Sequence, residues 1–591
     1  METSTTQSWC SQGHLTHFAG TDDAPPRIAA STRTTTLNQM RDGVLCEDTA
    51  KLSSSSAASP LLMPYRELCM RAGMHGVIVA LRYGVVPILL LLALLHIAQL
   101  FFDAGLSWIY PSPALTFVLT SWATSELAFW VYARCQIIGY QKRMVINRPR
   151  SSSPSERRQL FQRCVGLVQP DDQHMEGFLS GWFPNAHFTD LHRGNVEQWL
   201  AWALFDSRWR DLTRSEQAEV EGYLIAIERR LGHTFPDGFN PAIKSMRLTL
   251  DPVVVAHRPL IYYIVLMTIN LGNSIFLYSM GFRRHPVKNS AFMYWSYTPP
   301  PGDIINHRCK QEGTPPIVFV HGLGIGLAQY VHVIFQLMKL HQPLLLVEVL
   351  HISSQLHGNV SDRNHVIEAL QEMLTENGFS RGIFFGHSYG TIYVTWVIKC
   401  CPHIIASAFL VDPIVFLLCK KDVCYNFVYR KPTTWVELVL HYFAGREMHI
   451  AKTLSRHFQW SDNVLWAEDL YMRATVVLSE ADRIVDTVTV RDYLASQANR
   501  ACVQVVWLPH LHHAEFMFKP GVLQYVVDRL AEHTRARELA PLSSPVVSAD
   551  SAVRGGVHVK AYGSMVVEDR SQRRVMLRSL CGGGGGGGER G

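Results

Sequence analysis

The chain has 591 residues, of which 48% are hydrophobic and only 18% are charged. A soluble domain ordinarily has about 25% charged residues, so this composition excludes a chain that is disordered throughout and raises the question of a membrane. Lys and Arg exceed Asp and Glu by six (55 against 49), which is too dilute an excess to indicate a nucleic-acid partner. None of the 12 cysteines forms a C-x-x-C pair, and we expect no bound metal and no cofactor.

Both ends of the chain have the composition of disordered tails. Residues 1–60 are polar and rich in Ser and Thr, without the apolar run of a signal peptide, and residues 538–591 end in a run of glycines.

Residues 79–134 predict a hairpin of two transmembrane helices. Residues 83–102 and 104–125 each lack a charged side chain and have about the length that crosses the hydrocarbon core. Pro111 and Pro113 mark a start for the second helix, and residues 126–132 continue the apolar and aromatic pattern. Glu126 is costly inside a membrane and by default functional, unless it reaches the cytosolic interface.

Basic residues flank the hairpin and predict its orientation. Arg66, Arg71 and Arg82 precede it, and Arg134, Lys142, Arg143, Arg148 and Arg150 follow it. The positive-inside rule then places both ends in the cytosol. We therefore expect an integral protein of an endomembrane, such as the endoplasmic reticulum, with its catalytic domain in the cytosol.

Residues 150–257 have a helical pattern, which we interpret as a structural platform. Capping boxes are predicted at Ser153 to Glu156 and at Thr213 to Glu216. Residues 259–282 form a third uncharged stretch. A transmembrane helix here would place Arg283 on the luminal side, whereas an in-plane or re-entrant helix avoids that conflict.

Residues 290–535 predict an α/β domain with a mostly parallel sheet flanked by helices, because short β-branched runs alternate with helical patterns. The candidate strands are 317–320, 344–349, 382–385, 406–411, 475–478 and 503–508. Chemistry in such sheets lies at the carboxyl ends of the strands.

One of these strands runs directly into Gly386, His387, Ser388, Tyr389 and Gly390, and a helical pattern follows. This is the G-x-S-x-G pattern in its strand–turn–helix context, where the glycines permit a sharp turn that exposes a nucleophilic serine hydroxyl.

The first candidate strand ends in His321, Gly322 and Leu323. A loop of this kind lets a backbone N–H group point at a developing oxyanion. We expect the two donors to be the N–H groups of Leu323 and Tyr389.

A carboxylate and a histidine are expected to follow in that chain order. Asp482, after the strand 475–478, is favoured as the acid, with Glu480, Asp486 and Asp412 as alternatives. His513 is favoured as the base.

His510 and His512 compete with His513 for the role of base. The H-x-H-H cluster that the three form could instead bind a metal, but no matching set of ligands accompanies it.

The His-Gly loop, GHSYG, SEADRIV and HHAEF resemble the α/β-hydrolase superfamily in order and spacing. The strings LVDPIVFLLCKKDVCYNFVYRKP and RHFQWSDNVLWAEDLY look like those of membrane-anchored α/β-hydrolases of fungi and other microbial eukaryotes. The resemblance implies an α/β-hydrolase fold and a triad of Ser388, Asp482 and His513. It does not imply a substrate.

Residues 414–471 lie where family members insert a lid, and they are rich in aromatic side chains. A large apolar lid favours an apolar acyl substrate, and a membrane anchor would bring the site to lipid. We therefore predict a serine esterase or lipase acting on lipid esters. Alternatives are an acyltransferase on the same fold and a non-catalytic membrane scaffold. The H-x-x-x-x-D spacing of His357 and Asp362 matches that of some acyltransferases but is expected by chance.

Overall fold

The computed structural model describes residues 62–85, scattered positions between 87 and 98, and residues 113–142, 153–168, 172–287, 292–300, 315–496 and 502–535. The two expected tails, half of the first expected membrane span (83–102) and residues 104–112 of the second lie outside these described residues.

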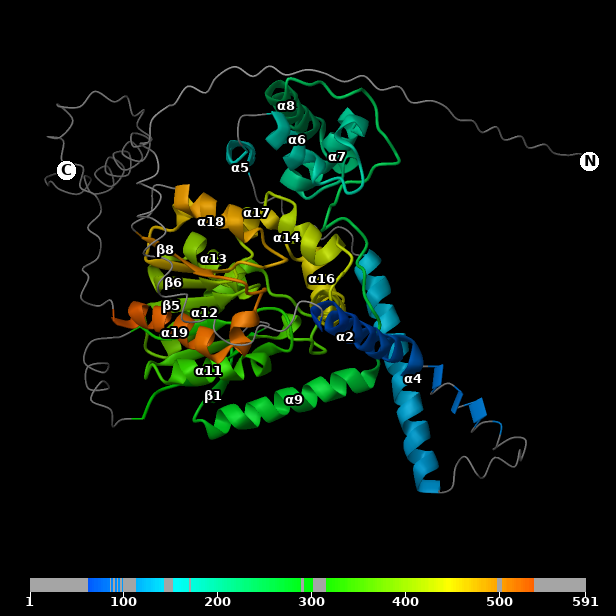
Figure 1. Ribbon diagram of the computed structural model, residues 1–591, viewed down its shortest axis with the longest axis vertical. Helices are drawn as coiled ribbons and strands as arrows, with labels where there is room; N and C mark the ends of the chain where they lie inside the picture. The colour runs from blue at the N-terminus through cyan, green and yellow to red at the C-terminus, as the bar shows by residue number, and fades with distance from the viewer. Residues whose placement is uncertain are drawn as a thin grey trace, which may run out of the picture. The chain divides into compact units, whose positions relative to one another are not determined.

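An eight-stranded sheet lies at the centre of the C-terminal half (Figure 1), in the order β1-β2-β4-β3-β5-β6-β7-β8. The strands are β1 Arg283–Pro286, β2 Phe292–Tyr297, β3 Ile317–Val320, β4 Leu344–Val349, β5 Gly382–His387, β6 Ile405–Val411, β7 Ala474–Ser479 and β8 Val503–Leu508. Strands β3 to β8 pair in parallel and correspond to the six predicted strands. β1 and β2, which were not predicted, form an antiparallel edge.

Helices cover both faces of the sheet. One layer holds α11 (Val331–Met338) and α19 (Pro520–Arg535), and the other holds α12 (Arg363–Glu376), α13 (Gly390–Cys400) and α18 (Thr487–Ser496). Successive strand residues point to opposite layers, so Phe319 packs with α11 and α19 while Val318 packs with α12 and α13. Together with the strand order, this layering is that of an α/β-hydrolase fold, as predicted.

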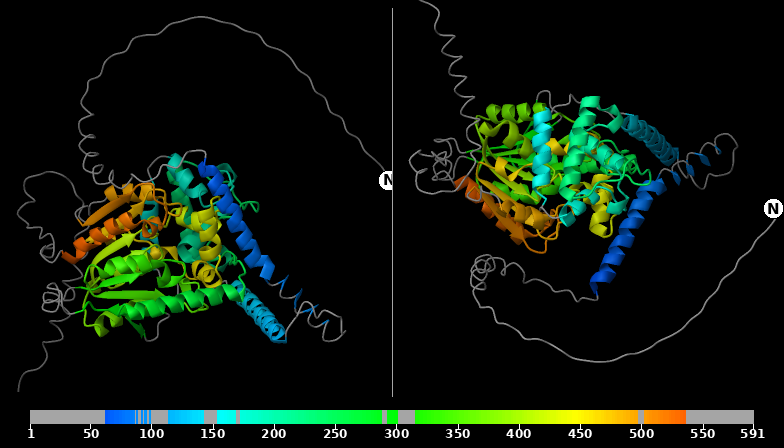
Figure 2. Two further views of the ribbon diagram at one scale, coloured as in Figure 1. Left: turned by 60° about the horizontal axis from the view of Figure 1, so that its bottom comes forward. Right: turned by 90° about the horizontal axis from the view of Figure 1, so that it is seen from above.

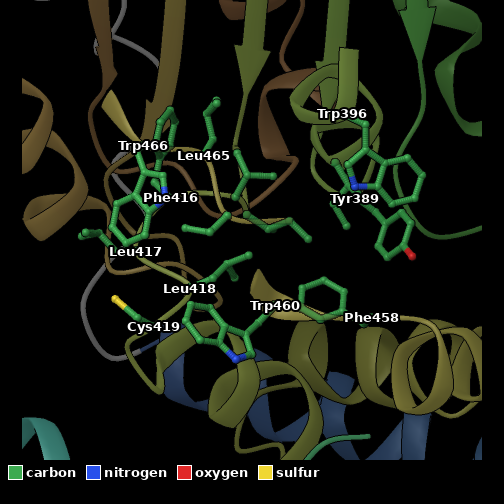
Figure 3. Packing of buried hydrophobic residues seen from close by; sticks show 14 of the residues in the cluster. Tyr389, Trp396, Phe416, Leu417, Leu418, Cys419, Phe458, Trp460, Leu465 and Trp466 are labelled. Atoms are coloured by element: carbon green, nitrogen blue, oxygen red, sulfur yellow. The ribbon is translucent and has the colours of Figure 1, made fainter. Parts of the chain in front are cut away.

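Four short helices lie between β6 and β7, in the expected lid (414–471). They are α14 Asp422–Cys424, α15 Trp435–Val439, α16 Met448–Arg456 and α17 Trp460–Asn463. Apolar side chains of α14, α16 and α17 join the core cluster on the face of the sheet that α12 and α13 cover. Figure 3 shows members of this cluster, among them Phe458 and Trp460 of the lid and Tyr389, the residue that follows Ser388 in the sequence.

The platform region contains α5 (Pro154–Gly166), α6 (Asp172–Ser180), α7 (Arg193–Phe205) and α8 (Arg214–Leu231). Both predicted capping boxes are formed, at the start of α5 and of α8. The indole of Trp460 donates to the carbonyl of Ala203 (2.8 Å), which joins the platform to the lid.

Three further helices precede the sheet: α2 (Leu62–Val79), α4 (Pro113–Lys142) and α9 (Leu260–Ser279). α4 extends to Lys142, eight residues beyond the end of the expected hairpin at residue 134. Among the described residues, α9 is the one helix that is long and apolar enough to cross a membrane.

Candidate active site

Ser388 occupies a sharp turn between β5 and α13, with a φ of 51° that is unusual for a residue other than glycine. A side chain at Gly390 would collide with the backbone of Val320 and His321, and one at Gly386 would lie 2.8 Å from Val394. The two glycines therefore let the turn pack tightly while Ser388 lines a cavity, which is the arrangement of a nucleophile elbow.

His513 connects Ser388 to Asp482. Its Nε2 lies 2.8 Å from the Ser388 hydroxyl oxygen, and its Nδ1 lies 2.6 Å from Asp482 Oδ2. The other oxygen of Asp482 accepts from the backbone N–H groups of Ile484 (2.7 Å) and Val485 (3.1 Å). The structure thus brings together the three side chains that the sequence favoured, in the geometry of a nucleophile, a base and an orienting acid.

The pKa of His513 is raised to about 9. Burial alone lowers it, but the charge of Asp482, the hydrogen bond between the two residues and the more distant charge of Asp412 outweigh the burial.

The alternative acids have other partners. Asp486 caps α18 through the N–H of Thr489, and Glu480 accepts from the backbone N–H of His510 at 2.7 Å. His512 places its Nδ1 2.9 Å from the carbonyl of Ala481, away from the nucleophile.

Asp412 is fully buried at the end of β6. Its carboxylate accepts from the N–H groups of Ala514 (2.8 Å) and Ser479 (3.2 Å), and one oxygen lies 3.9 Å from His387 Nε2. It therefore fixes the backbone beside His513 rather than His513 itself.

Tyr330 ties the nucleophile elbow to the His-Gly loop, residues 321–324. Its hydroxyl accepts from the N–H of Gly322 (2.9 Å) and lies 2.7 Å from Nδ1 of His387. Tyr330 was not predicted, because no motif marks a tyrosine eight residues beyond the loop glycine.

His321 fixes the same loop from its other side. Its Nε2 accepts from the N–H of Val349 (3.0 Å), so Nδ1 carries the proton and donates to the carbonyl of Gly322 (2.8 Å). Burial lowers the pKa of His321 to about 4, which keeps the imidazole neutral. A side chain at Gly322 would lie 2.9 Å from Cβ of Ser388, so the loop backbone closely approaches the nucleophile. Leu323 and Tyr389, the predicted oxyanion donors, line one cavity with Ser388.

Two cavities meet at the triad. The one around Ser388 is narrow and lined almost wholly by apolar side chains, among them Leu248, Leu454 and Phe458. The other, about 540 Å³, reaches His513 and has mixed walls that include Trp435, Arg430 and Arg483. Phe427 and Ile484 line both cavities and separate them.

Within the part of the chain that the structure describes, no group of three or more His, Cys, Asp or Glu side chains is placed to hold a metal ion. Asp362 of the H-x-x-x-x-D pattern caps α12 through the N–H groups of Asn364 and His365.

No protein-family model matches the chain, and neither does any curated protein sequence. Solved structures do resemble it. A bacterial membrane phospholipase A is 13% identical, with a TM-score of 0.34, 47% of this chain and 94% of that chain covered. An α/β-hydrolase from a lagoon-sediment metagenome is 17% identical (TM-score 0.30; 42% and 99% covered). Naproxen esterase from Bacillus subtilis is 14% identical (TM-score 0.30; 42% and 90% covered).

Proposed function

We propose that this chain is a serine hydrolase that cleaves carboxylic esters. The observation that carries the proposal is the continuous path from Asp482 through His513 to the Ser388 hydroxyl, with distances of 2.6 and 2.8 Å, at a strained turn.

In the first half of the reaction, His513 Nε2 takes the proton of Ser388 while the serine oxygen attacks the ester carbonyl. The N–H groups of Leu323 and Tyr389 would stabilise the oxyanion. The carbon–oxygen bond to the leaving group then breaks, and His513 returns the proton to the departing alcohol. Water hydrolyses the acyl-enzyme by the same steps, and the products are an alcohol and a carboxylic acid.

The two cavities support a lipid ester as the substrate class. Apolar side chains surround Ser388, where the cavity is only about 30 Å³. The cavity at His513, about 540 Å³, has the room and the mixed walls that a hydrocarbon chain and a polar alcohol require. We propose that this substrate comes from the membrane to which the chain is bound.

A fluorophosphonate probe tests the nucleophile directly. We expect the full chain to be labelled once, and Ser388→Ala to lose the label while keeping its thermal stability. Equal labelling of both proteins would place the reactive group elsewhere and reject the proposal. Products formed from a lipid ester, with and without an added alcohol acceptor, would then distinguish hydrolysis from acyl transfer.

A further inference from the structure

The helix α9 contacts the rest of the protein along one face over its whole length. Tyr263, Leu266, Asn270, Ser274 and Leu277 recur every three or four residues and are buried or half-buried. Two of these five side chains are polar, although they lie on the inner face.

The outer face of α9 is apolar. Its large aliphatic side chains are 42% to 62% exposed, and they are Ile264, Val265, Met267, Ile269, Leu271 and Ile275. A surface helix of a water-soluble protein shows the opposite arrangement, with its polar face outward.

Polar side chains of α9 direct their hydrogen bonds back to the helix itself. Thr268 donates to the carbonyl of Ile264 (2.9 Å), and Ser279 donates to that of Phe276 (2.7 Å). On the inner face, Asn270 also bonds a carbonyl of its own helix. These local bonds are what an environment without water requires of hydroxyl and amide groups.

The neighbouring helix α4 has the same character. Thr124 and Ser125 each donate to a carbonyl one turn earlier, at 2.8 Å. Between Pro113 and Ala133 the one acidic or basic side chain is Glu126, which is 1% exposed.

Glu126 fastens α4 to the start of α9. Its carboxylate accepts from the N–H groups of Leu260 (2.7 Å) and Ile261 (3.0 Å), and from the indole of Trp122 (3.3 Å). A carboxylate at this position satisfies free N–H groups at a helix start and interacts favourably with the helix dipole. The buried charge therefore joins two apolar helices and leaves their outer surface uncharged.

Both ends of α9 are held by the same body. The first turn packs with Phe129 of α4, and the last turn packs beneath the sheet, where the rings of Tyr278 and Trp295 lie 5.0 Å apart. Figure 2 shows α9 running along the α/β unit while α4 crosses its first turn. A helix that crossed a bilayer could not keep these contacts along its length.

We propose that the outer face of α9, with the adjoining exposed face of α4, lies in the hydrocarbon region of a bilayer, with α9 parallel to the membrane plane. Lipid, rather than a second copy of the chain, is the occupant because no acidic or basic side chain is exposed on α4 within residues 113–133 or on α9 within residues 260–279. Arg283, exposed directly after α9, is placed to meet lipid phosphates.

The surface also lies close to the candidate active site. Ile325, next to the His-Gly loop, packs against the cluster that three α9 side chains form with Phe129 of α4. Membrane contact therefore occurs at the helix that supports the oxyanion loop.

Photocrosslinking tests the surface. A benzoylphenylalanine residue replaces Ile275, or Val488 as a matched control, in full-length Ser388→Ala chains placed in phosphatidylcholine vesicles. Val488, on α18, is 47% exposed and far in sequence from both helices. We expect Ile275→benzoylphenylalanine to crosslink phospholipid at least tenfold more than the control. Equal yields, or a crosslinked dimer in place of lipid, would overturn the proposal. Because the chain lacks its nucleophile, the outcome does not depend on the proposed hydrolysis.

A second experiment tests the orientation of α9. Protease sites are inserted at Gly238 or at Gly378, two exposed turns on either side of the helix in the sequence. In sealed vesicles we expect both sites to be cleaved, or both to be protected. Cleavage of one alone would show that α9 crosses the bilayer, and would reject the in-plane arrangement.

Discussion

The side chain of Asp482 is positioned by backbone before it meets His513. Two N–H groups, from Ile484 and Val485, hold one carboxylate oxygen and leave the other for the imidazole. The imidazoles of His387 and His321 are also oriented by groups from other parts of the chain. His387 Nδ1 lies 2.7 Å from the hydroxyl of Tyr330, and His321 Nε2 accepts from the N–H of Val349 (3.0 Å). At this scale the site consists of side chains whose orientation comes from loops at the end of the sheet.

Replacing Asp482 by Asn should lower kcat by about 10³- to 10⁴-fold, because the imidazole loses its orienting charge. In the unmodified chain, kcat/KM should rise with pH and level off above about 9, where His513 becomes neutral. The pH–rate profile of Asp482→Asn should have its inflection at lower pH.

Glu480→Gln is the matched control, since Glu480 bonds His510 and not the triad. A larger loss in Asp412→Asn than in Asp482→Asn would assign the acid to Asp412. His513 also links pH to stability: its pKa is raised on folding, so its contribution is complete below about 6.5 and is lost as the pH rises through about 9.

Tyr330→Phe removes the hydroxyl that joins Gly322 to His387. We expect kcat to fall about tenfold with little change in KM, since the oxyanion loop loses its anchor. Loss of a partner for a buried N–H group should also lower the free energy of unfolding by about 1–3 kcal/mol.

Tyr393→Phe is the control that separates the loss of kcat from the loss of stability. It also removes a buried hydroxyl, but that hydroxyl contacts His351 and not the His-Gly loop. It should lose stability without losing turnover. If both variants turn over at the wild-type rate, Tyr330 has only a structural role.

Residues of the lid lie on one side of the triad, and the helix α13 lies on the other. The turn of the lid at Tyr425–Tyr429 carries Phe427 between the apolar cavity and the larger one. On the opposite side, α13 begins at the nucleophile and is buried along most of its length, so its position is fixed by the sheet. On the proposed function, we therefore expect the lid to select the substrate, while the sheet fixes the position of Ser388.

Phe427→Ala should merge the two cavities. We expect kcat/KM for long-chain esters relative to short-chain esters to rise about tenfold, because a difference of one or two methylene contacts corresponds to about 1–3 kcal/mol. A series of p-nitrophenyl esters measures this ratio. Tyr425→Ala, in the same turn but packed against Lys421, should leave it unchanged. An identical ratio in Phe427→Ala and wild type would contradict the role of the ring as a partition.

On the scale of the whole molecule, the lid joins regions that are far apart in the sequence. Arg456 of α16 is buried, and its guanidinium donates to the carbonyls of Thr249 and Asp251, each at 3.0 Å, and to that of Tyr140 in α4 (3.4 Å). The lid, α4 and the part of the platform that follows α8 meet at this one side chain.

Arg456→Met should lower the free energy of unfolding by about 2–4 kcal/mol, because three buried carbonyl groups lose their donor. Urea unfolding in detergent micelles measures the change. Arg491→Met, at a position with an exposed ion pair, should alter stability by less than about 0.5 kcal/mol. If Arg456→Met changed the free energy of unfolding by as little, the hydrogen bonds of Arg456 would contribute little to stability.

The sequence by itself predicted the features that depend on neighbouring residues. Short β-branched runs between helical patterns predicted strands β3 to β8. The capping boxes of α5 and α8 were predicted from four residues each, and the pattern around Ser388 predicted a strand–turn–helix. Hydropathy also marked 259–282 as an uncharged helix, but it could not show that Asn270 and Ser274 lie on the inner face of α9.

The tertiary structure decided which distant side chains meet. Asp482 and His513 are 31 residues apart, and Ser388 and His513 are 125 apart, so local pattern could only rank the candidates. Tyr330 and the buried cap formed by Glu126 were not predictable, because each depends on a contact whose partner carries no motif. Local sequence limits backbone conformation, whereas the chemistry of a site depends on contacts that exist only once the chain has packed.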